Sequence, residues 1–227
     1  MSVGDQVVAP GGTRRERMRA LMREDILAAA RKILQESGVK GLAMRPLGRA
    51  VGVTAPTLYD YFTSKDAVLN ALYVEGTDRL CDAFDAAIAA SRPGVDRLTA
   101  IGRAYRRFAL DNPDLYFLIF GRVDASYRPG DEEKARGHAV HEKLETVVRE
   151  AIEMGALRAE DPDLICNAMW ALAHGQITLE ISGFVDDCGP WQAEQVYEKS
   201  WEFLYSGLAP IGVRAEGPFP SVFAADG

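Results

Sequence analysis

The sequence has few of the features that mark membrane, secreted or metal-binding proteins. No apolar run approaches the ~20 residues of a membrane-spanning helix, and Gly, Pro and several arginines stand where the apolar core of a signal peptide would lie. The 3 cysteines (Cys81, Cys166 and Cys188) are odd in number and have no metal-type spacing. We therefore expect a protein of the reducing cytoplasm with inert thiols, no membrane segment, no metal and no cofactor.

Sequence motifs of several enzyme classes are also absent. The chain contains no G-x-S-x-G, no G-x-G-x-x-G and no H-E-x-x-H. His141 and Glu142 match the first two residues of H-E-x-x-H, but no second histidine follows at the required spacing. His138 and His141 lie one helical turn apart with Glu145 nearby, which is a weak metal constellation. We predict that the chain is not an enzyme, and an enzyme stays open as the alternative.

Apolar residues recur at intervals of three and four along most of the chain, and no segment is a convincing strand. This periodicity predicts an all-α fold. Gly, Pro and capping residues divide the chain into expected helices at Glu16–Ser37, Ala43–Val51, a short helix after Thr54, Lys65–Ala90, Val95–Leu110, Pro113–Phe120, Asp131–Met154, Asp161–Gly183 and Trp191–Leu208. Residues 1–15 are expected to form a disordered arm and residues 209–227 an irregular tail.

Residues 39–65 are the most informative stretch. Gly52 separates two short helical segments at a position where a residue following a helix needs positive φ. Thr54 is suited to cap the second segment, whereas Ala43 offers no side-chain cap to the first, which should weaken that helix end by about 1 kcal/mol. Two short helices joined by a glycine turn form a helix-turn-helix, whose second helix can enter the DNA major groove.

Charge divides the chain at the end of the same stretch. Residues 1–65 hold 11 Lys/Arg and 6 Asp/Glu, a net charge of +5, whereas residues 66–227 hold 15 and 27, a net charge of −12. A basic end on an acidic remainder suits a protein that docks one end on phosphates. Four arginines before residue 20 either extend this surface towards DNA or are simply solvated: Arg14, Arg15, Arg17 and Arg19.

The pattern R-x-L followed by G-V-T-x-x-T-L-Y-x-Y-F-x-x-K, here ending in TLYDYFTSK, resembles the DNA-binding domain of TetR-family transcriptional regulators from about Glu24 to Leu72. The stretch YRRFALDNPDLYFLIFG and the Trp-x-x-x-His-Gly pattern starting at Trp170 resemble the C-terminal domain of one TetR subgroup. The resemblance implies an N-terminal three-helix DNA-binding domain over residues 16–64. It also implies a larger C-terminal helical bundle over residues 65–208 for ligand binding and dimerisation.

Candidate DNA contacts lie on the two short helices. Hydroxyl groups suit phosphate oxygens, and small apolar groups suit thymine methyls. The resemblance implies phosphate clamping by Tyr59, Tyr61 and Lys65, although a packing role for either tyrosine stays open. Arg45 is the candidate for a base-edge or phosphate contact from the first short helix. The predicted DNA-contacting residues are Arg45, Thr54, Ala55, Pro56, Thr57, Tyr59, Tyr61 and Lys65.

Aromatic and aliphatic residues of the C-terminal region could line an effector pocket, because the interior of a helical bundle is a common place for one. The candidates are Phe84, Tyr105, Phe108, Tyr116, Phe117, Phe120, Leu144, Val148, Met169, Trp170, His174 and Ile177. The alternative for each of them is a place in the ordinary core. For His174 we favour a hydrogen bond within the bundle over a contact with the ligand.

The resemblance further implies a homodimer that pairs through the last two long helices. The candidate dimer contacts are Ile165, Ala168, Leu172, Leu179, Tyr197, Trp201 and Leu204. A two-fold dimer would place two reading helices on the half-sites of a palindromic operator in double-stranded DNA, about 34–36 Å apart.

We therefore expect a ligand-responsive repressor that a small apolar or amphipathic molecule releases from its operator. The sequence does not encode the effector, the operator, the regulated genes or the choice between repression and activation. A non-specific chromosome-organising protein is a second alternative, and the acidic remainder of the chain disfavours it.

Overall fold

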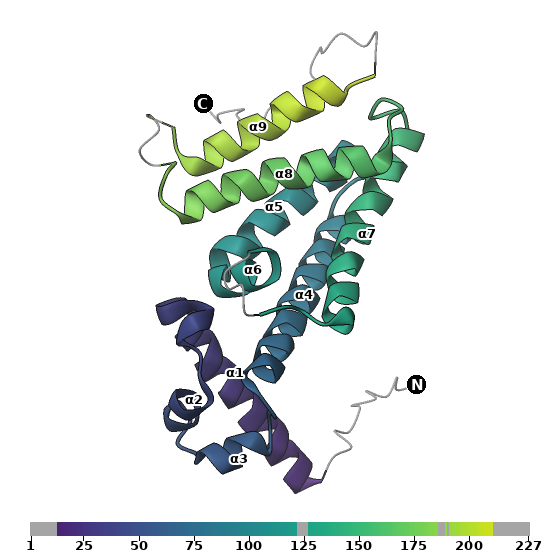
Figure 1. The fold of residues 1–227 in the computed structure, drawn as a ribbon. Helices are drawn as coiled ribbons and strands as arrows, with labels where there is room; N and C mark the ends of the chain where they lie inside the picture. The colour runs from purple at the N-terminus through teal and green to yellow at the C-terminus, as the bar shows by residue number, and fades with distance from the viewer. Residues whose placement is uncertain (1–12, 122–126, 186–188, 190, 211–227) are drawn as a thin grey trace, which may run out of the picture. The chain divides into compact units, whose positions relative to one another are not determined.

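The computed structural model describes residues 13–121, 127–185, 189 and 191–210 (Figure 1). Nine helices lie within these residues and none of them is in a strand, which confirms the all-α prediction. The chain forms two compact units that meet in sequence between Leu72 and Tyr73. We call the described residues up to Leu72 the head and those from Tyr73 onward the body. Most of the expected arm and tail, residues 1–12 and 211–227, lie outside the described part.

The head consists of α1 (Arg14–Gly41), α2 (Met44–Ala50), α3 (Ala55–Tyr59) and the first residues of α4 (Lys65–Ala90). Helix α1 begins two residues earlier than expected because Thr13 and Glu16 form a capping box. The Thr13 N–H donates to Glu16 Oε2 at 2.6 Å, and the Glu16 N–H donates to Thr13 Oγ1 at 3.2 Å. Gly38, with φ of 64°, interrupts the helix where the sequence predicted its end.

The turn between α2 and α3 has the local chemistry that the sequence indicated. Gly52 has a φ of 71°, and Thr54 Oγ1 accepts a hydrogen bond from the Thr57 N–H at 3.4 Å. Ala43 precedes α2 without a side-chain cap, as expected. Leu47 of α2 and Leu58 of α3 are both completely buried, so the two short helices share one small core.

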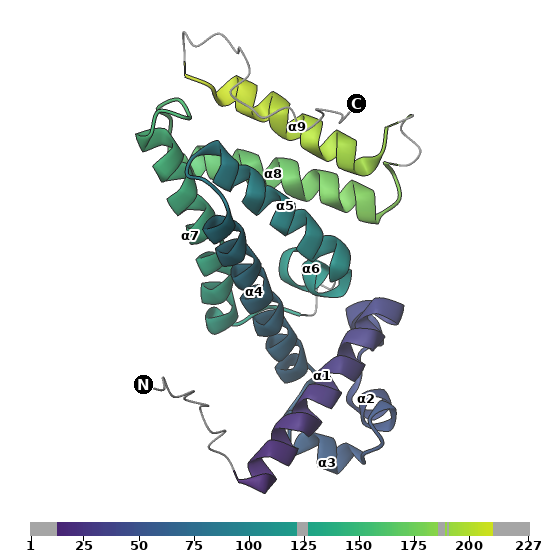
Figure 2. The ribbon, with the colours of Figure 1, turned by 180° about the vertical axis from the view of Figure 1, so that it is seen from behind.

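The body contains the rest of α4 together with α5 (Val95–Asp111), α6 (Pro113–Phe120), α7 (Asp131–Glu153), α8 (Pro162–Ile181) and α9 (Ala193–Leu208). In both views α7 runs beside α4, and α8 runs beside α9 (Figures 1 and 2). Two ion pairs join α7 to α4, Arg136–Asp78 at 2.6 Å and Lys143–Asp85 at 2.5 Å. None of the helices among the described residues is long and apolar enough to cross a membrane.

The first residues of α8 and α9 differ in how well their capping could be predicted from the sequence. Asp161 and Pro162 open α8 as predicted, with the Asp161 carboxylate accepting from the Asp163 N–H at 2.9 Å. Helix α9 starts at Ala193 rather than at Trp191, because Gln192 and Gln195 cap it with their side chains. This pair of glutamines is a less common capping box than one that begins with Ser or Thr.

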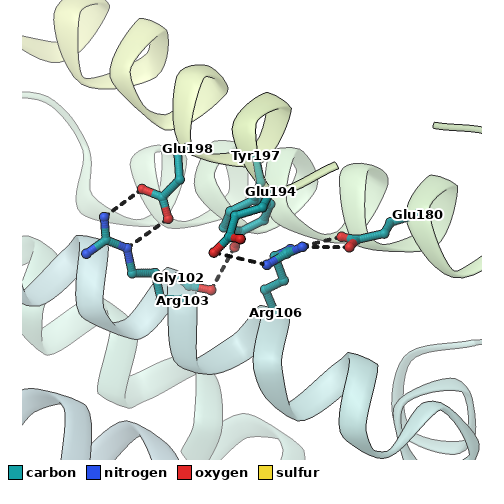
Figure 3. A network of polar contacts seen from close by, with 7 residues as sticks. All are labelled: Gly102, Arg103, Arg106, Glu180, Glu194, Tyr197 and Glu198. Atoms are coloured by element: carbon teal, nitrogen blue, oxygen red, sulfur yellow. Dashed lines mark hydrogen bonds and ion pairs between the residues drawn. The ribbon is translucent and has the colours of Figure 1, made fainter. Parts of the chain in front are cut away.

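Helix α5 is joined to α8 and α9 by a set of polar contacts (Figure 3). Arg106 donates two hydrogen bonds to Glu180, at 2.6 and 2.9 Å, and both side chains are only 17% exposed. Arg103 makes an equivalent pair of bonds with Glu198 at 2.7 and 2.8 Å. Between them the Tyr197 hydroxyl donates to the Gly102 carbonyl at 2.7 Å. Forked contacts of this kind fix both position and orientation, so α9 is held in one register on α5.

Replacing Arg106 tests this attachment. Arg106→Met keeps the length of the side chain but leaves the Glu180 carboxylate largely buried without its partner. We expect the free energy of unfolding to fall by about 2 kcal/mol, measured by urea denaturation. The matched control is Arg107→Met, which changes the exposed neighbouring arginine. Equal stability of the two variants would show that the Arg106–Glu180 pair does not hold the helices together.

Candidate functional site

The head presents most of the predicted DNA-contacting residues to solvent. Thr54, Pro56 and Thr57 are exposed, and 48% of the Tyr59 side chain is accessible. Ala55 and Tyr61 are half-buried, and Arg45 on α2 is exposed. The hydroxyl of Thr54 serves α3 as its cap and also lies 2.9 Å from the Thr57 hydroxyl, so its role is at least partly structural.

Two arginines of α1 hold the C-terminal end of α3. Arg19 donates to the Asp60 carbonyl at 2.7 Å, and Arg23 donates to the Tyr61 carbonyl at 3.4 Å. Their guanidinium groups also lie over aromatic rings, 5.2 Å from the centre of Tyr61 and 4.1 Å from that of Phe62. The sequence offered DNA contact or solvation for Arg19. The structure adds a third role, since Arg19 positions the helix that would read DNA.

Lys65, which was predicted to clamp a phosphate, also bonds within the head. Its ammonium group donates to the Val39 carbonyl at 2.6 Å, and the side chain is half-buried. This contact ties the start of α4 to the end of α1. The ammonium group has two further N–H donors, so the predicted phosphate contact stays a prediction. The resemblance alone could not reveal the contact with Val39, because it carries the role of a position and not its contacts in this chain.

A cavity of about 350 Å³ lies within the body. Helices α4 to α9 all contribute to its wall. Most of the lining is aliphatic or aromatic, which suits the burial of an apolar molecule of drug-like size. The lining residues are Tyr73, Phe84, Leu98, Ile101, Gly102, Tyr105, Ile119, Phe120, Lys134, Gly137, His138, Val140, His141, Leu144, Met169, Trp170, Ala173 and Trp201.

The sequence predicted part of this lining. Six predicted residues lie in the wall: Phe84, Tyr105, Phe120, Leu144, Met169 and Trp170. The other six do not line this cavity: Phe108, Tyr116, Phe117, Val148, His174 and Ile177. Four of these are buried core residues, Phe108, Tyr116, Val148 and Ile177. The missed residues follow helical spacing: Leu98 and Ile101 precede Tyr105 on one face of α5, and His141 precedes Leu144 on α7.

One edge of the cavity is basic. Lys134, His138 and His141 lie at i, i+4 and i+7 on α7, and no aspartate or glutamate is among the described residues of the lining. Lys134 also contacts the exposed Asp131 at 3.4 Å, which is a weak surface pair. The cavity therefore combines an apolar interior with a polar edge that favours acceptor or anionic groups.

A polar cluster beside the cavity joins α6 and α8. The Tyr116 hydroxyl lies 2.7 Å from His174 Nδ1 and 3.5 Å from the Thr178 hydroxyl. Burial lowers the pKa of His174, and desolvation raises the pKa of Tyr116. A neutral imidazole beside a protonated phenol can accept its hydrogen bond through Nδ1. Because His174 is held in this way and does not line the cavity, its geometry agrees with the bundle role that the sequence favoured.

The lowered pKa of His174 makes the stability of the body depend on pH. The stability that the neutral ring contributes is complete above the unfolded-state pKa of about 6.5 and is lost as the pH falls through the lower pKa of the folded state. His174→Gln keeps a hydrogen-bond acceptor for Tyr116 but does not titrate. We expect its melting temperature to fall less than that of the unmodified protein between about pH 7.5 and pH 5.5. His138→Gln, at an exposed position on α7, is the control and should retain the full decrease.

An exposed apolar line runs along α8. Its members recur at helical spacing: Leu164, Ala168, Ala171, Gly175 and Leu179. Leu164 is 62% exposed and Leu179 is 50% exposed. On the neighbouring helix α9, Phe203 is 66% exposed. Large apolar side chains that gather at the surface commonly mark a surface that binds another macromolecule.

Several predicted dimer contacts are not on this surface. Ile165, Tyr197 and Trp201 are buried within the protomer at 2%, 2% and 6% exposure, and this part of the prediction was wrong. An amphipathic helix that is covered on one side can carry apolar residues on two faces, and the sequence did not separate them. Ala168 and Leu179 are exposed, whereas Leu172 and Leu204 are half-buried.

The thiols and acidic groups of the described residues give no indication of a metal site. No group of three or more His, Cys, Asp or Glu side chains there could hold a metal ion. Cys166 is buried, and burial raises the pKa of its thiol to about 12, so the thiol stays protonated near neutral pH. Burial also raises the pKa of Cys81. Cys188 lies outside the described residues.

Comparison with known proteins identifies both parts of the chain. Residues 26–72 match the family described as bacterial regulatory proteins, tetR family. Residues 98–204 match the family described as tetracyclin repressor-like, C-terminal domain. These matches include α3 and the turn before it in the head, and most of the cavity-lining residues in the body.

Relatives and solved structures agree with these matches. The chain is 28% identical over 153 residues to the HTH-type transcriptional regulator Rv1816 of Mycobacterium tuberculosis, covering 66% of this chain and 65% of the relative, just under two thirds of its length. It is 43% identical over 113 residues to tetracycline repressor protein class D of Escherichia coli, covering 50% of this chain and 44% of that protein. A structure of a protein with unknown function from Rhodococcus sp. RHA1 is similar with a TM-score of 0.74 and 28% identity, covering 83% of this chain and 95% of the other.

Proposed function

The chain belongs to the tetR family of bacterial regulatory proteins, and from this premise we propose that it is a transcriptional repressor whose binding to operator DNA is controlled by a small molecule in the body cavity. The observation that carries the proposal is the combination, in one chain, of an exposed reading helix with an apolar cavity of about 350 Å³. One relative bears the name tetracycline repressor protein, which supports repression over activation.

Five residues of α2 and α3, all exposed except the half-buried Ala55, would contact the operator. Tyr59 and Thr57 offer hydroxyl groups to phosphate oxygens, Pro56 and Ala55 offer apolar contact to thymine methyls, and Arg45 offers a guanidinium group to a phosphate or a guanine edge. Arg19 and Arg23 hold the end of α3 in place, so these contacts would be made by a positioned helix. The net charge of +5 over residues 1–65 attracts the head to DNA.

The effector would occupy the cavity with its apolar part in the interior and its polar part near Lys134, His138 and His141. Helix α4 has residues in both the cavity wall and the head, so it could transmit the effect of a ligand to the DNA contacts. Its residues Tyr73 and Phe84 line the cavity, while its first residue, Lys65, is bonded within the head. A ligand that prefers a different position of α4 would shift the protein towards a state in which the reading helices no longer fit the operator.

The occupant that we propose for the exposed face of α8 is a second copy of this chain. Ala168, Ala171 and Gly175 are small, so a partner helix could approach closely, and Leu164 and Leu179 would lose their exposure. A two-fold pair repeats the same contacts on both sides of the axis. It would also supply the second reading helix that a palindromic operator needs.

The experiment that tests DNA recognition is a gel-shift competition between DNA from upstream of the protein's own gene and random DNA at one fixed salt concentration. We expect at least a roughly thousandfold preference for the upstream DNA. Equal affinities would favour a non-specific chromosome-organising protein, and the absence of binding to either DNA would reopen the enzyme alternative.

The same assay tests the role of Tyr59. Tyr59→Phe removes only the hydroxyl group, and a hydrogen bond to a charged phosphate is worth about 1.5–3 kcal/mol. We expect the variant to bind upstream and random DNA with affinities reduced alike, by roughly tenfold or more, because a phosphate contact carries no sequence information. Unchanged affinity for both DNAs would remove Tyr59 from the set of phosphate contacts.

A change at Gly175 tests the pairing surface. A Cβ atom added there would meet nothing within 4 Å in the protomer, and glycine is a poor helix former, so Gly175→Arg should fold normally. We expect this variant to sediment as a monomer and to lose roughly a hundredfold in operator affinity, since the two half-sites could no longer be bound together. Met154→Arg, at a side chain 58% exposed at the end of α7, is the control that should stay dimeric. A dimeric Gly175→Arg variant with full operator affinity would place the pairing surface elsewhere.

A further inference from the structure

The basic side chains of the described cavity wall all lie on α7. Lys134, His138 and His141, which we call the basic edge, share one face of this helix. Two other polar groups of the wall are already bonded to each other, since the Trp170 N–H donates to the Tyr105 hydroxyl at 3.4 Å. A charged or strongly polar ligand group would therefore meet its partners at the basic edge.

The basic edge has few partners inside the protein. Lys134 pairs with the exposed Asp131 at 3.4 Å, and 58% of the lysine side chain is accessible. His138 is exposed and His141 is half-buried, and neither imidazole has a hydrogen-bond or ion-pair partner among the described residues. These three side chains therefore have donors to offer to a molecule that enters the cavity.

The carboxylates around the basic edge are held elsewhere. The two ion pairs that join α7 to α4 occupy Asp78 and Asp85 with other cations of α7. The buried Glu133 turns back towards the start of α7, since a Cβ atom added at Gly130 would lie 2.6 Å from its Oε2. A helix N-terminus stabilises a carboxylate in that position. The basic edge is therefore without a buried counter-ion in the described part of the chain.

The apolar part of the cavity begins directly beyond the basic edge. Leu144 lies three residues after His141 on the same face of α7, and Phe84 and Met169 line the wall from α4 and α8. An apolar tail would be buried against these side chains. A charged head at the basic edge would keep part of its contact with water, which limits the cost of desolvating it.

We infer that the effector is an apolar carboxylic acid, bound as its anion with the carboxylate at Lys134 and His141 and the hydrocarbon tail against Leu144 and Met169. The inference rests on the proposed effector cavity and adds the chemistry that selects its occupant. The two carboxylate oxygens accept hydrogen bonds from the ammonium group and from an imidazole N–H, which is present in either protonation state of the ring. A carboxylate carries the single negative charge that one lysine balances, whereas a phosphate ester carries a charge of about −1.5 to −2 near neutral pH.

The test compares three probes that share one tail and differ in the head group: 4-phenylbutyrate, 4-phenylbutanamide and 3-phenylpropyl phosphate. Calorimetry at one fixed pH gives the affinity of each for the full chain and for its variants. We expect the acid to bind roughly tenfold more tightly than the amide, because hydrogen bonds to a charged group are the stronger ones. Lys134→Met and His141→Leu should each lower this ratio by roughly fivefold.

The matched control is Arg149→Met, which removes one positive charge from the same helix. Arg149 is 55% exposed, close to the value for Lys134, and does not line the cavity. Its replacement should leave the ratio of acid to amide affinity unchanged. Because the ratio compares two probes of one shape, it cancels most of the effect of a changed cavity wall.

A second measurement needs no variant. Raising the salt concentration should weaken binding of the acid and leave binding of the amide nearly unchanged, since salt screens an exposed ion pair. Equal affinities of the acid and the amide, insensitive to salt and to Lys134→Met, would overturn this inference while the effector cavity stands. Tighter binding of the phosphate ester than of the acid would overturn it as well. If none of the three probes binds, the proposed cavity falls and the inference falls with it.

Discussion

The close contact between Trp201 and the backbone of α5 at Gly102 determines how the last helix packs on the body. An added Cβ atom there would lie 3.1 Å from the ring, which is tighter than most Cβ contacts, so the indole would have to move by a few tenths of an ångström. The ion pair of Arg103 with Glu198 holds α5 against α9, and that of Arg106 with Glu180 holds α5 against α8 (Figure 3). Helix α9 thereby closes one wall of the cavity, while its exposed residue Phe203 belongs to a different face. The shape of the cavity and the position of α9 therefore depend on the same few atoms.

Helix α4 is the element through which we propose that the cavity is coupled to the DNA contacts. Its first residue is bonded within the head, and its later residues Tyr73 and Phe84 form part of the cavity wall. The ligand must bind the DNA-released state much more tightly than the DNA-binding state. To change their ratio from 1:99 to 99:1, its binding free energies for the two states must differ by about 5.5 kcal/mol. Only the part of the ligand's binding free energy that differs between the two states counts towards this requirement. Each CH₂ group that the ligand buries in one state and not in the other contributes about 0.8 kcal/mol.

Much of the fold could be predicted from local signals. Gly52, Thr54 and Asp161 define helix ends through their own backbone preferences and side-chain oxygens, so they mark the same boundaries in the sequence and in the structure. The capping box of Thr13 and Glu16 was also visible as a pattern, and reading it would have placed the start of α1 correctly. The functional surfaces were harder to predict than the helix boundaries, because they depend on which face of each helix is covered by another helix. Periodicity shows that Tyr197 and Trp201 are apolar positions of one helix, but it does not say whether they meet α5 or a second protein chain.

The central claim is that the cavity and the operator are coupled, and reciprocity tests it most directly. If a compound in the cavity weakens operator binding by some factor, the operator must weaken binding of that compound by the same factor. The measurement is the affinity of one cavity-binding compound for the protein alone and for the protein saturated with operator DNA. The account predicts that the affinity for the DNA-bound protein is lower, by the factor found for DNA release. Identical affinities in the two states would contradict it, because the cavity and the reading helices would then act independently.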